Sequence, residues 1–190
     1  MADVWAEPLP VLSCEDVTLR ELLASDARAL HGALTRGHAG EFLPAPPDSV
    51  AGFEAFIGIN RRKRQEGRGG CLGVIPAGGE WPLGLFQLTV VERSPLVVEW
   101  GFILAEELWG TGVFVKSASL TLDFLFGPYG ADQVQGRCAV ENGRATSALR
   151  KLGAAPGPVS HETSFFDRPR LGQVWTVSAD AWTTRRATTS

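Results

Sequence analysis

The chain has 190 residues, of which 44% are hydrophobic and 21% are charged, a balance typical of a globular protein with a sizeable core. Its 18 basic and 21 acidic residues give a net charge of −3, which does not favour nucleic acid as the main partner. No apolar run approaches the ~20 residues that a membrane helix needs, and the amino terminus lacks the basic start and apolar core of a signal peptide. We therefore expect a soluble, cytoplasmic protein with neither a membrane nor a nucleic acid as partner.

Cysteines and histidines are few and scattered along the chain. The 3 cysteines are an odd number and form no CxxC pair, which favours a reducing compartment over a disulfide framework. The 3 histidines stand alone, without the spacing of metal ligands. We expect no metal site.

The first elements are predicted from hydrophobic periodicity. Residues 1–13 are expected to form a poorly structured arm, and residues 14–182 a single domain. Within this domain, residues 16–22 alternate between apolar and polar, as in a strand. Residues 25–37 and 50–65 are expected to form helices, joined by a proline-rich loop that contains residues able to cap the second helix.

The middle of the chain is rich in strand signals. Residues 69–78, 81–92 and 96–104 read as three strands separated by turn residues. The first two predict a hairpin, which the third continues as a meander. A helix over residues 112–126 and a strand over residues 133–140 follow.

The last part of the chain completes a mixed pattern. Residues 142–153 predict a helix, and residues 159–166 and 173–182 predict two strands. Residues 183–190 are expected to be a loose tail. The resulting order, β-α-α-β-β-β-α-β-α-β-β, indicates an α/β (α+β) domain with helices on the faces of a mixed sheet.

A glycine turn links the strand over 96–104 to the helix over 112–126. Gly110 and Gly112 stand in the segment "WGTG". The first N–H groups of a helix are unpaired and carry partial positive charge, and glycine lets an anion approach them closely. The turn therefore predicts a diphosphate site. The absence of GxGxxG and of a P-loop lysine disfavours dinucleotides and nucleoside triphosphates, and a purely structural tight corner remains an alternative.

Three motifs occur in a fixed order: "VVEWGFIL", "WGTG" and "NGRATSALRKLGA". Together they resemble the GNAT superfamily of acetyl-CoA-dependent N-acetyltransferases, and most of all the group that contains the ribosomal-protein N-terminal acetyltransferases. The resemblance covers residues 16–182, and its specific part is residues 98–154. It implies a mostly antiparallel sheet of about seven strands with about four helices, in which the family's fourth and fifth strands splay apart.

The resemblance also implies a cosubstrate site and an acceptor. Acetyl-CoA would bind with its diphosphate on the glycine turn and its pantetheine arm along the open strand, and an amine would accept the acetyl group. Asn142 matches an asparagine that hydrogen-bonds the pantetheine arm, although a helix-capping role is equally sound chemistry. The implied cosubstrate-binding residues are Phe102, Ile103, Leu104, Trp109, Gly110, Thr111, Gly112, Val113, Phe114 and Asn142.

Acetyl transfer needs a base to take a proton from the amine and a donor for the carbonyl oxygen. Glu99 matches an acidic residue in many relatives, and its apolar neighbours would withdraw it from water. The alternative is a strand glutamate that faces solvent. The resemblance implies the backbone N–H of Phe102 or Ile103 as the donor to the carbonyl oxygen.

The general acid is less well defined by the motifs. Leu149 occupies the position of a tyrosine found in many relatives, and Ala145 that of a serine found in the N-terminal acetyltransferases. Ser147, Thr146 or water could protonate the leaving thiolate instead. Cys138 has no basic partner nearby in the sequence, so a buried thiol is favoured over a covalent acyl-enzyme.

The acceptor and the catalytic competence stay open at this level. The loops over residues 35–49 and 165–173 are expected to build the acceptor site, for a protein amino terminus or a small-molecule amine. A different class of function, an acyl-CoA-binding module without turnover, is the alternative reading. Dimers are common in the family, and the sequence leaves a homodimer open.

Overall fold

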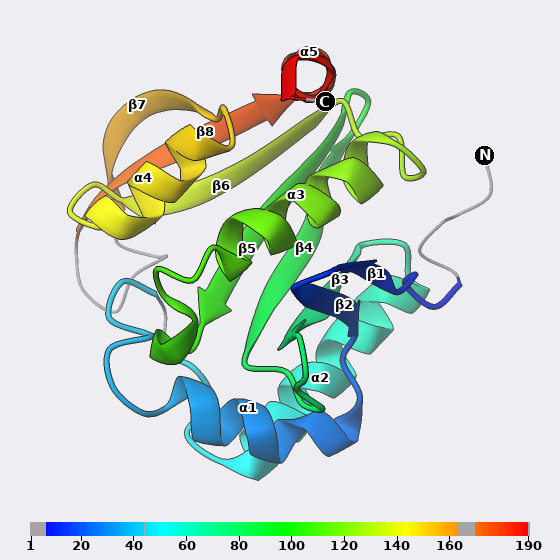
Figure 1. Ribbon diagram of the computed structural model, residues 1–190, viewed down its shortest axis with the longest axis vertical. Coiled ribbons are helices and arrows are strands. Elements are labelled where there is room, and N and C mark those ends of the chain that lie inside the picture. The colour runs from blue at the N-terminus through cyan, green and yellow to red at the C-terminus, as the bar shows by residue number, and fades with distance from the viewer. Residues whose placement is uncertain (1–6, 44, 163–169, 190) are drawn as a thin grey trace.

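The structure is a computed structural model that describes residues 7–43, 45–162 and 170–189. One eight-stranded sheet runs through it, in the order β1-β2-β3-β4-β5-β6-β8-β7 (Figure 1). Its strands are β1 (Leu12–Cys14), β2 (Val17–Glu21), β3 (Gly69–Pro76), β4 (Gly84–Arg93), β5 (Leu96–Leu104), β6 (Gln133–Ala139), β7 (Ala155–Glu162) and β8 (Arg170–Ser178). The α helices are α1 (Ala27–Leu34), α2 (Val50–Gln65), α3 (Val113–Phe126), α4 (Gly143–Lys151) and α5 (Ala179–Thr189).

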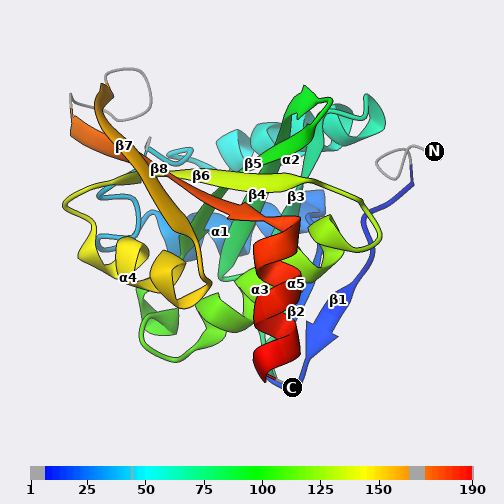
Figure 2. The same ribbon diagram turned by 90° about the horizontal axis from the view of Figure 1, so that it is seen from above.

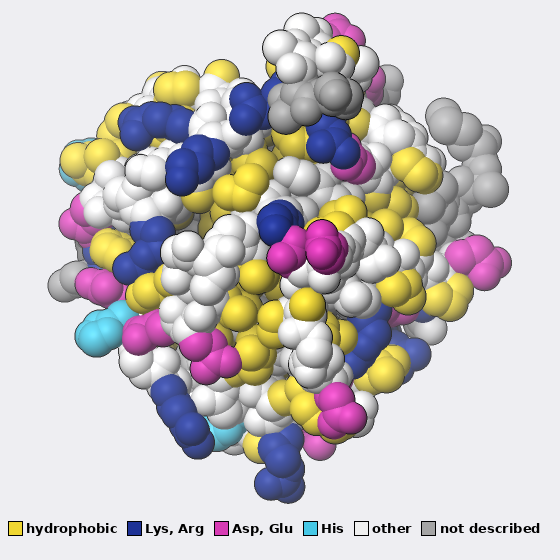
Figure 3. Space-filling view, viewed as in Figure 1, with side chains coloured by type: hydrophobic (Ala, Val, Ile, Leu, Met, Phe, Trp, Pro, Cys, Tyr) yellow, Lys and Arg dark blue, Asp and Glu magenta, His cyan; other side chains and the backbone are white. Residues whose placement is uncertain are grey.

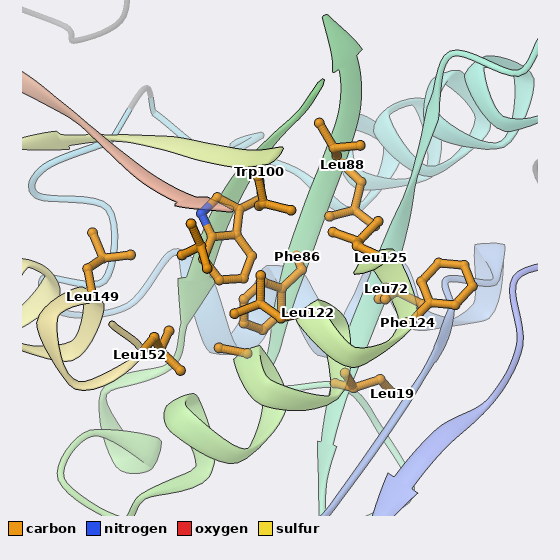
Figure 4. Packing of buried hydrophobic residues seen from close by; sticks show 14 of the residues in the cluster. Leu19, Leu72, Phe86, Leu88, Trp100, Leu122, Phe124, Leu125, Leu149 and Leu152 are labelled. Carbon is orange, nitrogen blue, oxygen red and sulfur yellow. The ribbon is translucent and has the colours of Figure 1, made fainter. Parts of the chain in front are cut away.

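Helices cover both faces of the sheet, with α1 and α2 on one face and α3 and α4 on the other (Figures 1 and 2). Side chains alternate across each strand, so one strand contributes to both layers. On the α3 face, Phe86 and Trp100 point toward Leu122 of α3 (Figure 4). On the other face, Leu85 packs with Phe53 of α2 in a separate buried cluster. The expected class, a mixed and mostly antiparallel sheet flanked by helices, is confirmed.

The strands β5 and β6 pair over only part of their length. They are parallel neighbours at Val97–Glu99 and Gln133–Gln135, whereas β5 stays paired with β4 as far as Leu104. The indole of Trp100 lies against Gly136, where an added Cβ would meet its Nε1 at 2.6 Å. Beyond this point the two strands diverge, which leaves one edge of β5 without a neighbouring strand in the described part of the chain. The fourth and fifth predicted strands are β5 and β6, so the expected splay between them is confirmed.

Several predicted elements match the structure closely. The helix over 50–65 and the strand over 96–104 have the predicted bounds. Ser49 caps α2 through its Oγ, which accepts a hydrogen bond from the N–H of Gly52 at 3.1 Å. The penultimate strand begins earlier than predicted, at Ala155, because it pairs with β8 from that residue onward.

The end of the chain corrects the sequence analysis. Residues 179–182 do not continue a strand, and residues 183–189 are not a loose tail, because α5 spans Ala179–Thr189. Trp182 is 4% exposed and donates from its Nε1 to Asp123 of α3 at 2.8 Å, and Arg186 pairs with the same carboxylate at 2.9 Å. This anchoring to a distant helix explains why a local pattern missed α5.

The expected amino-terminal arm is also attached to the sheet where it is described. Leu12–Cys14 forms the short edge strand β1, and Leu9 is 5% exposed. Arg64 donates to the carbonyl oxygen of Glu7 at 2.7 Å. Among the described residues, no helix is long and apolar enough to cross a bilayer.

Candidate functional site

A cavity of about 370 Å³ lies where β5 and β6 diverge, between the glycine turn and α4. Most of the residues predicted for cosubstrate binding line it, together with one predicted catalytic residue: Phe102, Ile103, Leu104, Trp109, Gly110, Gly112, Phe114, Asn142 and Ser147. Thr111 and Val113 stand beside them in the turn without lining the cavity. The structure thus brings the motif residues into one place, with Glu99 as the exception.

The two glycines of the turn have left-handed backbone conformations. Gly110 has φ of +76° and Gly112 has φ of +86°, which residues with a Cβ rarely adopt. An added Cβ at either position would meet nothing within 4 Å, so the space in front of this backbone is open. Gly112 caps α3, whose first N–H groups have no partner within the helix. The turn can therefore present its N–H groups to an anion.

The open edge of β5 has a defined set of main-chain groups. The N–H of Ala105 donates to the carbonyl oxygen of Leu83, the residue just before β4, at 2.8 Å. Trp109 donates from its Nε1 to the carbonyl oxygen of Leu104 at 3.1 Å, on the opposite side. Since main-chain groups alternate along a strand, Phe102 and Leu104 face the cavity and Ile103 faces β4. Of the two predicted oxyanion donors, only the N–H of Phe102 points the right way.

Phe114, at the start of α3, packs into an aromatic cluster. Its ring centroid lies 4.6 Å from that of Phe102 and 5.9 Å from that of Phe86. The bulk at the start of α3 is therefore directed into the wall of the cavity, and the turn itself stays open.

Cations that the sequence analysis missed lie at this cavity. Arg144 and Lys151 of α4 line it, and the guanidinium of Arg144 is 3.4 Å from the centroid of the Trp109 ring. Basic side chains gather over α4 in Figure 3 (dark blue, upper left). Arg144 lies in the first turn of α4, where a cation interacts unfavourably with the helix dipole. This unfavourable position could have indicated from the sequence that Arg144 binds a ligand.

Asn142 and Ser147 occupy different parts of α4. The Oδ1 of Asn142 accepts a hydrogen bond from the N–H of Ala145 at 3.0 Å, so its capping role is present, and its amide nitrogen is the group that could meet a ligand. Ser147 is exposed to the cavity. Thr146 is 6% exposed, lies outside the lining, and donates to the carbonyl of Gly143 at 3.2 Å. Of the two hydroxyls predicted as proton donors, Ser147 is the accessible one.

Cys138 of β6 also lines the cavity, although it is 5% exposed. Burial raises the pKa of its thiol to about 11, so the thiol is neutral near pH 7. A neutral thiol is a poor nucleophile, which agrees with a structural role.

Glu99 lies on the other face of the sheet, in a second cavity of about 450 Å³ beside α1 and α2. The chain neighbours Val98 and Trp100, which were expected to withdraw Glu99 from water, point to the opposite face, so the groups around its carboxylate come from other elements. The Oε2 of Glu99 accepts a hydrogen bond from Gln135 at 3.1 Å and pairs with the Nε of Arg137 at 3.4 Å. Within the described part of the chain, its Oε1 receives no hydrogen bond, so it is available to a ligand.

The two cavities meet at the end of β5. Gly101, Phe102, Ile103 and Arg137 line both. Ligands that entered from opposite faces of the sheet would therefore come into contact at this segment.

The predicted acceptor loops contribute unequally. The N–H of His38 and its ring nitrogen contact the carboxylate of Glu106, which ties the loop after α1 to the segment before the glycine turn. Arg170 donates to the carbonyl of Glu41 at 3.1 Å and pairs with Glu141, so it anchors this loop. Asp167 and Arg168, also in the second loop, lie outside the described residues.

Comparisons with known proteins agree with this geometry. A family model described as the GNAT acetyltransferase domain matches residues 16–155. A comparison with curated protein sequences finds no match.

Solved structures of acetyltransferases share the fold. One is a ribosomal-protein-S5-alanine acetyltransferase from Vibrio fischeri, with a TM-score of 0.80, 15% identity, and coverage of 91% of this chain and 98% of that one. Another is RimL, a ribosomal alpha-N-protein acetyltransferase in complex with coenzyme A, with a TM-score of 0.81, 14% identity, and coverage of 90% and 99%. A third is a GCN5-related N-acetyltransferase from Brucella melitensis, with a TM-score of 0.78, 19% identity, and coverage of 94% and 82%.

Proposed function

Since the chain belongs to the GNAT acetyltransferase family, we propose that it transfers an acetyl group from acetyl-CoA to a primary amine in one ternary complex. The observation that carries this proposal is the meeting of two chemically different cavities at residues 101–103 of β5. One offers main-chain donors and cations to an anionic cosubstrate. The other offers a carboxylate to an amine.

Acetyl-CoA supplies the acetyl group as an activated thioester. The N–H groups of residues 110–114 donate to its diphosphate, and the left-handed glycines with open space before them support this role. Arg144 and Lys151 add positive charge at the same cavity. The carbonyl of Phe102, the N–H of Leu104 and the amide nitrogen of Asn142 hold the pantetheine arm.

Glu99 is the proposed general base. An alkylammonium ion is mostly charged at neutral pH and must lose a proton before its nitrogen can attack. The Oε1 of Glu99 takes this proton, directly or through a water molecule. The contacts of Oε2 to Gln135 and Arg137 hold the carboxylate in place for it.

The remaining steps use groups at the end of β5 and on α4. The amine nitrogen forms a bond to the carbonyl carbon and the carbon–sulfur bond breaks. The nitrogen then passes its second proton to water, and the thiolate gains one proton from a donor that is itself reprotonated by water. The N–H of Phe102 donates to the carbonyl oxygen while negative charge builds on it. The hydroxyl of Ser147 is the proposed proton donor to sulfur.

The acceptor belongs to one of two broad classes. Two of the similar structures are named for acetylation of ribosomal proteins, which makes a protein amino terminus one class to test. Small-molecule amines are the other. We place the reaction in a reducing cytoplasm, which the free cysteines Cys14, Cys71 and Cys138 support.

The test is release of free CoA thiol from acetyl-CoA in the presence of a panel of amines and peptides. We expect amine-dependent thiol release and an N-acetylated product of the matching mass. Tight binding of acetyl-CoA in calorimetry without turnover of any amine would contradict the proposal.

That outcome would favour the second candidate, an acyl-CoA-binding module without catalysis. Leu149 and Ala145 stand where many relatives carry proton donors, and neither side chain can donate a proton. Leu149 is also buried, with 1% of its surface exposed. The accessible hydroxyl of Ser147 is the feature that favours catalysis over binding alone.

A further inference from the structure

We propose that the acceptor is a singly charged amine that carries a bulky apolar group next to its amino group. This inference rests on the proposed function and names the substrate class of the same site. It depends on three features of the cavity beside α1 and α2: its walls, its charge balance and its opening at Gly101.

The walls of this cavity are mostly apolar. They come from α1, the loop after it, α2, β4 and β5, and include Leu34, Leu43, Phe53, Phe56, Leu85 and Ile103. Leu34 and Phe53 are 2% and 1% exposed, so the deeper wall is fixed by packing. The ring of Phe53 meets that of Phe56 edge-on, with centroids 6.5 Å apart. An apolar ligand group gains by leaving water for the apolar part of this wall, where a hydroxyl group would lose its hydrogen bonds, and Gln87 and Thr89 are its uncharged polar members.

The described part of this cavity offers one carboxylate. Among the described residues that line it, Glu99 and Arg137 are the charged ones, and they pair with each other. One ammonium group can approach the Oε1 of Glu99. Among the described residues that line the cavity, no second carboxylate is present to receive a further ammonium group of a diamine or an aminoglycoside.

Gly101 keeps the opening toward the acetyl group clear. It lies between Glu99 and Ile103 on the same face of β5 and lines both cavities. Its φ lies outside the left-handed region, and an added Cβ would meet nothing within 4 Å. Neither backbone conformation nor packing requires glycine there, although glycine weakens a strand interior. The free space beside Gly101 would let the amino group reach the acetyl group, while the apolar group of the acceptor stays in the cavity beside α1 and α2.

Two sources could supply this chemistry: a small amine, or the first residue of a peptide. The test measures kcat/KM for matched acceptors with the wild-type protein. Isoamylamine is compared with ethanolamine and 1,4-diaminobutane, and a leucine-first tetrapeptide amide is compared with its serine-first counterpart. We expect kcat/KM to be at least roughly tenfold higher for the apolar acceptor than for its polar counterparts, among the small amines or among the peptides, whichever class reacts. Equal rates, or a preference for the diamine or the hydroxylated acceptors, would overturn the inference while leaving the proposed function intact.

A pair of variants on α2 separates a wall contact from a general effect on the helix. Phe56→Gln puts a polar group into the wall. It should lower the ratio of kcat/KM for the apolar acceptor to kcat/KM for its polar counterpart about tenfold. Ile59→Gln lies one turn away, at a residue 45% exposed and outside the lining, and should keep the wild-type preference. The same preference in both variants would contradict the assignment of Phe56 to the acceptor.

A second pair tests the opening. Gly101→Val should remain folded and lose roughly 30-fold or more in kcat/KM for the preferred acceptor, because its side chain enters the space that the amine crosses. Gly32→Ala on α1, where an added Cβ also meets nothing within 4 Å, is the control. A Gly101→Val variant that matched wild type in melting temperature and turnover would overturn the role of the opening. A protein that binds acetyl-CoA but acetylates none of these acceptors would instead refute the proposed function itself.

Discussion

The two cavities on either side of β5 offer a ligand different kinds of groups. The one between the glycine turn and α4 offers main-chain N–H groups, an open strand edge and cations. The one beside α1 and α2 offers side chains from five separate elements. Under the proposed function, the fold's main chain would bind the cosubstrate that the family shares, and side chains on the other face would select the individual acceptor.

The largest expected effect is at the acceptor side. Glu99→Gln keeps the shape and the contact to Gln135 but removes the proposed base, so kcat/KM should fall by about 10²–10⁴. The affinity for acetyl-CoA, measured by calorimetry, should stay within about threefold of wild type, since Glu99 lies outside that cavity. The exposed Glu92→Gln on the same sheet is the control. Unchanged turnover in Glu99→Gln would remove this carboxylate from the mechanism.

The next effect is at the cosubstrate side. Gly112→Ala should weaken acetyl-CoA binding by about tenfold or more, because the new Cβ enters the open space before the turn and keeps the diphosphate from one charge-assisted hydrogen bond, worth roughly 1.5–3 kcal/mol. It should also lower stability by about 1–2 kcal/mol, the cost of a left-handed residue with a Cβ. Gly130→Ala, at φ of +76° and with nothing within 4 Å of the new Cβ, carries the same strain away from the cavity.

Comparison of these two glycine variants separates strain from binding. Both should melt at similarly lowered temperatures, and only Gly112→Ala should lose affinity in calorimetry. Equal affinities in the two variants would show that the turn does not hold the cosubstrate.

A smaller effect is expected on α4. Ser147→Ala should lower kcat by up to about tenfold with little change in KM, because water can replace a proton donor in part. Thr146→Ala removes the hydroxyl that bonds the carbonyl of Gly143, so it should lower the melting temperature more than kcat. A wild-type kcat for Ser147→Ala would assign the proton transfer to water.

The smallest effect is expected at Cys138. The variant Cys138→Ala should keep kcat within about threefold of wild type, since direct transfer needs no acyl-enzyme. The raised pKa, about 11, means that the reactive thiolate forms only as the pH rises toward that value. Iodoacetamide at pH 8 should therefore label the exposed Cys14 and leave Cys138 unmodified, as peptide mass spectrometry can show. An acetylated Cys138 trapped with acetyl-CoA alone would contradict direct transfer.

Parts of the fold that depend on local signals were predictable. The helix α2 has a capping serine and an apolar side, and β5 is a short apolar run bounded by turns. The helix α5 was missed because its stability comes from Trp182 and Arg186, which both contact Asp123 about sixty residues earlier in the chain. No pattern within residues 179–189 reports that contact.

The candidate site divides in the same way. The glycine turn and the residues of β5 are contiguous in sequence, so motifs could locate them. Arg137 and Gln135 contact Glu99 across two strands, and the apolar acceptor wall combines α1, α2 and β4. The sequence pointed to Val98 and Trp100 as the groups beside Glu99, but these chain neighbours face the other side of the sheet, and its apolar surroundings come from other elements. Such contacts depend on strand order, which a single sequence does not display.

The most direct test of the account is a crystal structure of the protein with coenzyme A. We predict the diphosphate within hydrogen-bonding distance of the N–H groups of residues 110–114, and the pantetheine arm along Phe102 and Leu104 with its thiol near Gly101. Coenzyme A bound away from the glycine turn, or with its thiol remote from the end of β5, would contradict the account.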